Sequence, residues 1–459
     1  MLPPHFFYLF TLLFIYFFYY LCSKQSKNEN DNNNLRTQNM TYKLRFLFLG
    51  TVLILCMSSC KKDLFNQEKY DEYVDFHFMI DNRDLNHDWK LTKSSTISVT
   101  TTDDVRSVQV LTENPYSSNR AEIAANEICE NHAATLSYTV PIGQATLYLA
   151  AISSDKQYIG VVPFDYGTKK IDLATETLQP SGTLMSPTPQ TFSYLYEANF
   201  PVPDDFVYND CVLRISKGYT DDPTQILLTV KLEALGTLKQ IASGIHLAGF
   251  SYDDILSVEI VEGEQMDKDF PLPKNMIDSN ENLMKGRKGE AIINMFEDAH
   301  WALLREKTSV GSIPREILNT TREIKELSSD IVEPITTTYC INFKSRELAR
   351  QLTFDNIDPF ILEEYNGATW EVHTYDYKFN DVLKDVFRGN TAAFDNHISW
   401  CITIPQRDAR YPLEGIAMGN YNRETGNING PYDDFVYWIQ DHTSHTDWYL
   451  HPTRPQQLY

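Results

Sequence analysis

Residues 194–216 read YLYEANFPVPDDFVYNDCVLRIS, and this stretch joins an acidic, proline-containing loop to an alternating strand. In the strand, Cys211, Leu213 and Ile215 are expected on one face, with the residues between them on the other. The loop carries five oxygen-bearing side chains: Glu197, Asp204, Asp205, Asn209 and Asp210. Oxygen ligands at the mouth of a β-scaffold are what Ca²⁺ requires, so a calcium site is expected here. An ordinary acidic turn, in which Asp and Asn accept bonds from backbone amides, is the alternative.

The composition favours a strand-rich protein and excludes some classes of partner. The 459 residues suffice for two or three domains, and the aromatic share is 13%, mostly from 27 Tyr and 25 Phe. The formal net charge is −22. Such an excess of negative charge argues against nucleic acid as a partner and against electrostatic adhesion to anionic lipid.

The first sixty residues predict export and a lipid anchor. A first apolar run, Phe6–Cys22, precedes an Asn-rich spacer, and a second start-like pattern begins at Met40. There, Lys and Arg precede the apolar run Phe46–Met57, and small residues stand directly before Cys60. This order is typical of a bacterial lipoprotein signal, which predicts lipidation of Cys60, with a transmembrane anchor as the alternative. Lys61 and Lys62 stand where an inner-membrane retention signal would place Asp, which favours the outer membrane.

The remaining cysteines are widely spaced. They are Cys129, Cys211, Cys340 and Cys401, and they form no CxxC motif, so a zinc site is not expected. Buried free thiols are expected, with a Cys340–Cys401 disulfide as the first alternative.

Alternating apolar residues predict a mainly β fold with two antiparallel β-sandwich domains, the second larger and carrying one or two short helices. The predicted strands of the first domain are 73–80, 96–101, 105–112, 135–140, 146–152 and 158–164, with a short helix at 122–131. The predicted strands of the second domain are 226–235, 255–261, 338–343, 369–375 and 399–405. Helices are predicted at 290–306, 317–327 and 346–352, and irregular connections at 267–289 and 355–367. The predicted divisions are an over-extended N-terminus (1–39), a lipoprotein signal peptide (40–59), a tether (60–72), an immunoglobulin-like sandwich (73–177), a linker (178–191) and a β-rich domain (192–459).

Several motifs in residues 190–459 together carry a family resemblance. The acidic stretch 194–210 resembles the entry motif of the LruC-type domain of exported bacterial lipoproteins, except that Ala198 stands where the motif has an acid. Asp358–Ile361 and Glu371–His373 resemble its Pro-Phe-Ile and Glu-Val-His segments. Residues 399–416 and 431–452 are similar to its closing Trp-x-Ile-x-Ile-Pro strand and aromatic segment. The resemblance implies an exported β-rich domain and no established activity.

Two further groups of side chains are candidate sites. An aromatic platform for stacking sugar rings is predicted at Tyr432, Trp438, Trp448 and Tyr449, with core packing as the alternative. Glu371 lies two residues from His373 on the same strand face, so it could orient His373 as a general base. A packed, hydrogen-bonded histidine is the alternative.

These features predict a lipid-anchored outer-membrane or cell-surface protein that acts as a non-catalytic binding or adhesive module, with Ca²⁺ as the expected cofactor. A glycan or a surface protein is the expected ligand. Two alternatives remain open: a carbohydrate-active hydrolase with an Asp/Glu pair, and a structural component of the envelope.

Overall fold

Strand β8 (Thr188–Tyr196) is the centre of the fold, because it pairs with three other strands. The computed structural model describes residues 67–78, 80–178, 182–202, 205–320, 332–365, 367–378, 380–384, 397–422 and 425–459. β8 pairs antiparallel with β9 (Cys211–Tyr219) and β18 (Cys401–Ile404), and parallel with β3 (Glu122–Ile128). One ten-stranded sheet therefore runs through both halves of the molecule.

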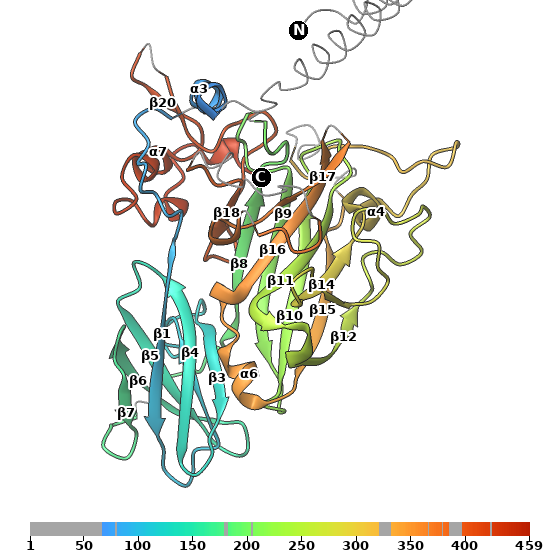
Figure 1. Cartoon of the computed structure of the whole chain (residues 1–459). Coiled ribbons are helices and arrows are strands. Elements are labelled where there is room, and N and C mark those ends of the chain that lie inside the picture. The colour runs from blue at the N-terminus through green and yellow to red at the C-terminus, as the bar shows by residue number, and fades with distance from the viewer. Residues whose placement is uncertain are drawn as a thin grey trace, which may run out of the picture. The chain divides into compact units, whose positions relative to one another are not determined.

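The first β-sandwich packs a three-stranded sheet, in the order β4-β1-β7, on one end of the ten-stranded sheet, in the order β3-β2-β5-β6. Alternating side chains such as Ile97, Val108, Leu136 and Leu149 point between the layers and are fully buried. The strands are β1 (Thr92–Thr100), β2 (Ser107–Leu111), β4 (Ala133–Pro141), β5 (Thr146–Ile152), β6 (Tyr158–Asp165) and β7 (Lys170–Asp172). Figure 1 shows these strands in blue to green at the lower end of the molecule.

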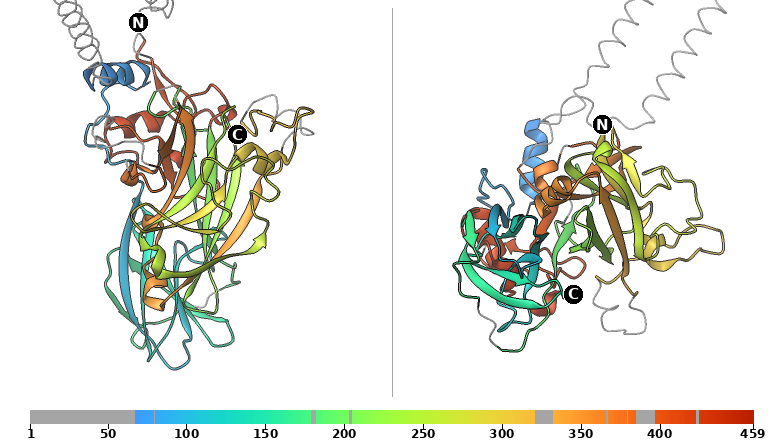
Figure 2. Two further views of the ribbon diagram at one scale, coloured as in Figure 1. Left: turned by 45° about the vertical axis from the view of Figure 1, so that its right-hand side comes forward. Right: turned by 90° about the horizontal axis from the view of Figure 1, so that it is seen from below.

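The second β-sandwich packs the other end of the ten-stranded sheet, in the order β12-β15-β10-β9-β8, on a five-stranded sheet, in the order β13-β14-β11-β16-β17. Its strands are β10 (Gln225–Ala234), β11 (Ala242–Ser251), β12 (Ile255–Gly263), β13 (Leu283–Lys285), β14 (Glu290–Phe296), β15 (Ile335–Phe343), β16 (Ile357–Tyr365) and β17 (Ala368–Val372). The views in Figure 2 show these strands, in green to orange, beside those of the first sandwich.

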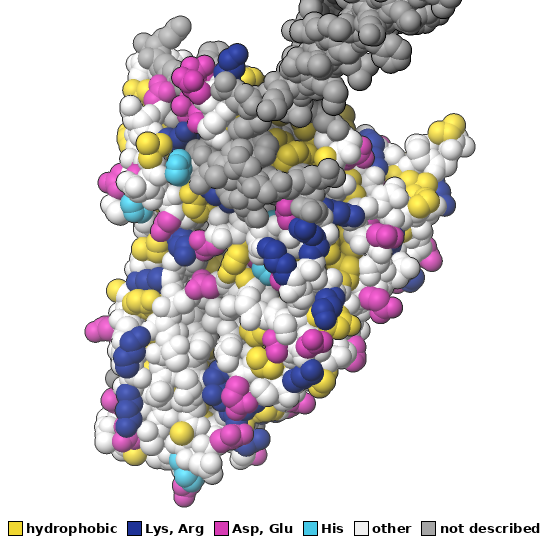
Figure 3. Space-filling view, viewed as in Figure 1, with side chains coloured by type: hydrophobic (Ala, Val, Ile, Leu, Met, Phe, Trp, Pro, Cys, Tyr) yellow, Lys and Arg dark blue, Asp and Glu magenta, His cyan; other side chains and the backbone are white. Residues whose placement is uncertain are grey.

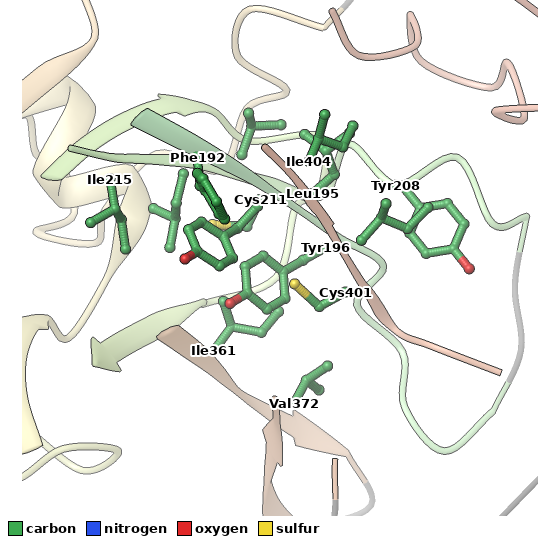
Figure 4. Packing of buried hydrophobic residues seen from close by; sticks show 14 of the residues in the cluster. Phe192, Leu195, Tyr196, Tyr208, Cys211, Ile215, Ile361, Val372, Cys401 and Ile404 are labelled. Carbon is green, nitrogen blue, oxygen red and sulfur yellow. The ribbon is translucent and has the colours of Figure 1, made fainter. Parts of the chain in front are cut away.

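The main core lies between the two sheets of the second sandwich. Phe192, Tyr196 and Cys211 from the ten-stranded sheet pack in one cluster with Ile361 and Val372 of the five-stranded sheet (Figure 4). All four described cysteines are free thiols, so the alternative Cys340–Cys401 disulfide does not form.

The described residues also contain short helices and two further strands. The α-helices are α3 (Gln67–His77), α4 (Ala299–Leu304), α6 (Arg346–Gln351) and α7 (Asp433–Gln440), and the short strand pair is β19 (Asn420–Tyr421) with β20 (Ile428–Asn429). The 3-10 turns are η1 (Tyr252–Asp254), η2 (Phe354–Asn356), η3 (Tyr375–Tyr377), η5 (Trp448–Leu450) and η6 (Pro455–Gln457). The predicted mainly β fold with paired antiparallel sandwiches is confirmed.

The strand predicted at 73–80 is wrong, because residues 67–77 form helix α3. Val74 is fully buried and Phe78 nearly so, and the amide of Phe78 donates to the carbonyl of Val74. Tyr70, Val74 and Phe78 are spaced four residues apart, which places them on one face of a helix. This helical spacing outweighed the alternation on which the strand prediction relied.

Three other segments also differ from the prediction. Residues 122–128 form strand β3 rather than a helix, because pairing with β2 and β8 overrides the helix propensity of its alanines. Residues 290–296 form strand β14, and only 299–304 form the predicted helix; the apolar run AIINMF is buried on both faces of its sheet. The predicted irregular connection 355–367 contains strand β16.

The residues from 67 to 459 form one compact unit by their contacts. Cys60, the predicted signal peptide and most of the predicted tether lie outside the described residues, and the predicted helix 317–327 is described only to residue 320, where no helix is found. β8 starts at Thr188 and therefore overlaps the end of the predicted linker, residues 178–191. The division of the chain into domains stays a prediction. Within the described ranges, no helix has both the length and the apolar character needed to cross a bilayer.

Candidate functional site

The acidic loop 197–210 connects β8 to β9, and its two ends lie side by side. Tyr196 pairs with Cys211, and the amide of Asp210 donates to the carbonyl of Tyr196 (3.1 Å). In the described part of the loop, three residues that are not glycine have positive φ angles: Asn199 (104°), Phe206 (52°) and Tyr208 (54°). Such conformations each cost of order 1–3 kcal/mol and persist only where the surroundings hold them.

Aromatic side chains hold the loop in this conformation. The rings of Phe200 and Phe206 lie 5.2 Å and 5.4 Å from that of Trp400, and both are buried. The hydroxyl of Tyr208 donates to the carbonyl of Ser399 (2.8 Å). Burial of these rings supplies the free energy that offsets the backbone strain.

Asp210 is a buried carboxylate at the end of the loop. Its side chain is buried with 7% exposure, and its Oδ2 accepts a hydrogen bond from the amide of Ala198 (2.6 Å). Burial raises the pKa of Asp210 well above its usual range, and the nearby carboxylates of Asp205, Glu363 and Glu414 raise it further. Its environment therefore opposes a bare negative charge.

Glu363 of β16 comes close to Asp210 from the opposite sheet. Both of its carboxylate oxygens accept from the amide of Asn199 (2.8 Å and 2.9 Å), which directly follows the Ala198 amide bound by Asp210. Burial raises the pKa of Glu363, and Lys239 opposes this with its Nζ 2.6 Å from Oε2. Among the described residues, Lys239 neutralises Glu363, and Asp210 forms no ion pair.

The structure brings together only part of the predicted calcium ligands. Asp204 lies outside the described residues, Glu197 is fully buried, and Asp205 is half-buried within electrostatic reach of Asp210. Asn209 donates to the carbonyl of Pro412 (3.2 Å) and to Glu414 (3.4 Å). Its Oδ1 faces Gly236, where an added Cβ would lie only 2.5 Å away.

Sequence reasoning missed the two carboxylates that join this site from elsewhere in the chain. Glu363 is the last buried residue of β16, and Glu414 follows β18 by ten residues. Their proximity to Asp210 depends on how the two sheets stack, and sequence spacing carries no signal for that. Within the described ranges, three or more metal-ligand atoms lie within 4.8 Å of one another at two places, neither of which includes Asp210: His246-Asp358-His373 and Asp84-Asp441-His442.

The histidine cluster is buried on the outer side of the five-stranded sheet. Oδ2 of Asp358 lies 2.7 Å from Nδ1 of His373 and 3.0 Å from Nδ1 of His246. Nε2 of His373 lies 3.1 Å from Glu371, so both ring nitrogens are engaged by carboxylates. Although burial lowers the pKa of His373, Asp358 and Glu371 outweigh it and raise the value to about 10. His373 is therefore a buried imidazolium with no free nitrogen for general-base chemistry.

Glu371 also binds the backbone of the loop at residues 382–384, which packs on this sheet. Its carboxylate accepts from the amides of Val382 (2.7 Å) and Leu383 (2.7 Å), and from that of Lys384. Glu297 does the same for a second loop, accepting from three consecutive amides at residues 275–277. The two loops bury a small apolar core on the outer sheet face, so these charges have a structural role.

The second cluster lies nearer the surface. Nδ1 of His442 hydrogen-bonds to Asp84, and this contact lowers the pKa of the Asp84 carboxyl to about 2 and raises that of His442. Asp441 accepts from the amide of Thr443 (3.0 Å). An ion pair accounts for this arrangement.

The predicted sugar-stacking platform is wrong, because its rings are in the core. Trp438 of α7 and Trp448 of η5 are fully buried with ring centroids 5.8 Å apart, and the ring of Tyr432 lies 5.0 Å from that of Trp448. Tyr449 retains 6% exposure. These rings hold the C-terminal segment together and offer no face to a ligand.

On the described part of the face shown in Figure 3, basic and acidic side chains are interspersed. The two signs of charge therefore form no single large patch on the described part of this face.

Comparisons with known proteins identify a domain but no activity. No match to the chain was found among curated proteins. A solved structure described as a "putative lipoprotein from Bacteroides ovatus" is similar, with 15% identity, a TM-score of 0.47, and coverage of 77% of this chain and 99% of that chain. Residues 223–449 match the family model described as a domain of unknown function (DUF4842). The matched region includes Glu363 and Glu414 but not the loop 197–210.

Proposed function

We propose that this chain is an exported, non-catalytic binding module, anchored by a lipid on Cys60 at the outer membrane or cell surface and stabilised by Ca²⁺ at the loop 197–210. The lipobox-like residues before Cys60 support the anchor, and the LruC-type motifs support the same location. The match to a domain of unknown function assigns no reaction, and both nitrogens of His373 are already engaged.

The observation that carries the calcium proposal is the charge balance around Asp210. This carboxylate is more than nine-tenths buried, lies near three other carboxylates, and forms no ion pair among the described residues. An uncompensated buried charge costs several kcal/mol, so it is expected to take up a proton or a cation. A hard divalent cation satisfies several carboxylates at once.

Ca²⁺ is the expected cation because of its ligand preferences. It accepts six to eight oxygen ligands at about 2.3–2.6 Å in flexible geometry, whereas Mg²⁺ takes only one or two carboxylates and keeps its waters. Asp210 and Asp205 would contribute from the loop, and Glu414 from the C-terminal segment. Ca²⁺ would then fix the strained loop against the second sandwich, which gives the module a rigid end.

The experiment is a thermal melt of the purified full chain in detergent with excess Ca²⁺ and with EDTA. Ca²⁺ should raise Tm by several degrees, because a ligand at about 100 times its Kd adds about 2.7 kcal/mol. Asp210→Asn should abolish the rise, while the control Asp103→Asn, which removes a 99% exposed carboxylate, should retain it. An equal Tm in Ca²⁺ and EDTA for the unmodified chain would exclude the calcium site.

The anchor is tested independently by mass spectrometry of the protein extracted from membranes. A lipid-modified N-terminal Cys60 peptide is expected, and Cys60→Ser should leave the protein without the modification. An intact peptide spanning residues 58–62 with an unmodified thiol would contradict the anchor.

A further inference from the structure

An open groove of about 670 Å³ lies where the first sandwich meets the turn between β9 and β10. Its floor is the face of the β3-β2-β5 strands that points away from the core of the first sandwich, and Tyr219 of β9 lines its side. Backbone groups of this floor are already paired, since β2 lies between β3 and β5. A peptide therefore cannot bind here by adding a strand, and recognition must come from side chains.

A row of uncharged polar side chains crosses this floor. The hydroxyl of Tyr158 on β6 donates to Oε1 of Gln109 on β2 (2.6 Å), and Nε2 of Gln109 donates to Oδ1 of Asn126 on β3 (3.1 Å). The row sets the orientation of both amides and leaves Nδ2 of Asn126 without an acceptor among the described residues. Burial raises the pKa of Tyr158 to about 12, so its hydroxyl stays protonated. This row of side chains is thus preorganised to donate and accept hydrogen bonds without a charge.

Aromatic rings and charges complete the groove. Tyr158 and Tyr219 both line it, and Tyr219 is fixed by a bond from its hydroxyl to the carbonyl of Ala124 (3.2 Å). At the rim, Lys156 and Asp221 neutralise each other with Nζ 2.7 Å from Oδ2. Flat apolar ring faces beside fixed amide groups suit a ligand that has hydroxyl groups and C–H faces.

We infer that this groove binds a neutral oligosaccharide segment. Hydroxyl groups of the sugar would bond to the amides of Asn126 and Gln109, and the C–H face of a ring would lie on Tyr158 or Tyr219. Arg106 also lines the groove, but an anionic polymer fits less well, because Lys156 is paired with Asp221 and the chain carries −22 net charge. The inference is separate from the calcium site, which lies in a different loop, and it names the ligand class of the proposed binding module.

The test is a glycan array of neutral and acidic oligosaccharides probed with the full chain in detergent, followed by calorimetric titration of the strongest glycan. Neutral glycans should be retained, and Asn126→Ala should weaken Kd at least about tenfold, because it removes the free amide donor and loosens Gln109. Tyr158→Phe keeps the ring but removes the hydroxyl, and should weaken Kd by about two- to fivefold.

The matched control is Tyr166→Phe, which removes a hydroxyl that donates to the carbonyl of Ser94 away from the groove, and its Kd should be unchanged. Each variant is checked for an unaltered Tm, so that loss of binding is not loss of folding. Binding should persist in EDTA and in Asp210→Asn, which separates this inference from the calcium proposal. Retention of acidic glycans only, retention of none, or an unchanged Kd in a folded Asn126→Ala variant would each overturn it.

Discussion

Replacing Lys217 with methionine should make the protein more stable, and the gain should depend on pH. Lys217 of β9 is 2% exposed, and its Nζ donates to the carbonyl of Leu352 (3.0 Å). It forms no ion pair among the described residues, and burial lowers its pKa from 10.5 to about 7. Methionine has a similar length and no charge to bury.

The size of the gain in the free energy of unfolding follows from the linkage between protonation of Lys217 and folding. The unfolded chain holds the Lys217 proton up to pH 10.5, whereas the folded protein releases it above about pH 7. Below pH 7 the buried charge therefore costs up to about 5 kcal/mol, and this cost declines to zero as the pH rises towards 10.5. Losing the bond to Leu352 offsets about 1 kcal/mol of the gain. Lys217→Met should thus add at most about 4 kcal/mol at neutral pH, and above pH 10.5 it should cost about 1 kcal/mol, because only the lost hydrogen bond then counts.

Urea unfolding followed by tryptophan fluorescence, at several values from about pH 6 to about pH 10, measures this difference in free energy of unfolding. The gain should shrink by about 1.4 kcal/mol per pH unit above pH 7. The control Lys156→Met alters a 73% exposed lysine and should show no comparable slope. A difference between Lys217→Met and the unmodified chain that stays constant with pH would refute the reasoning.

The remaining predictions concern His373 and Gly236. His373→Gln should lower the free energy of unfolding by about 3–5 kcal/mol below pH 6.5, because two buried carboxylates lose their cation. With a folded pKa of about 10, the stabilising effect of His373 is lost as pH rises from 6.5 to 10, so urea unfolding should show the difference narrowing over that window. Gly236→Ala should cost about 1–3 kcal/mol, because its Cβ would lie 2.7 Å from the carbonyl oxygen of Asn209, whereas Gly143→Ala, which meets nothing within 4 Å, should be close to neutral in the same assay.

Alternation along the chain was sufficient to predict the sandwiches, because burial of one sheet face imposes a two-residue period on strands such as β1 and β10. Alternation did not predict the strands that are buried on both faces or that lack large apolar residues. Strand β14 is buried on both faces and therefore carries a continuous apolar run, which also suits a helix. Strand β3 is rich in alanine, and only its pairing with β2 reveals it as a strand.

The candidate site was predictable only in its local part. The acidic loop is visible in the sequence, because Asp205 and Asp210 are close along the chain. Glu363 and Glu414 join it through the stacking of sheets and the return of the C-terminal segment, which no local pattern records. The aromatic platform failed for a related reason: Trp438 and Trp448 are as suitable for a core as for a sugar, and burial decides between the two.

Calorimetric titration of Ca²⁺ into the full chain tests the central claim most directly, because it measures whether the carboxylates around Asp210 take up a cation. We expect binding that Asp210→Asn abolishes and Asp103→Asn preserves. Binding should weaken as the pH falls, since protons compete for a carboxylate whose pKa is raised. Absence of binding heat, together with no protection of the loop 197–210 from hydrogen exchange in Ca²⁺, would contradict it.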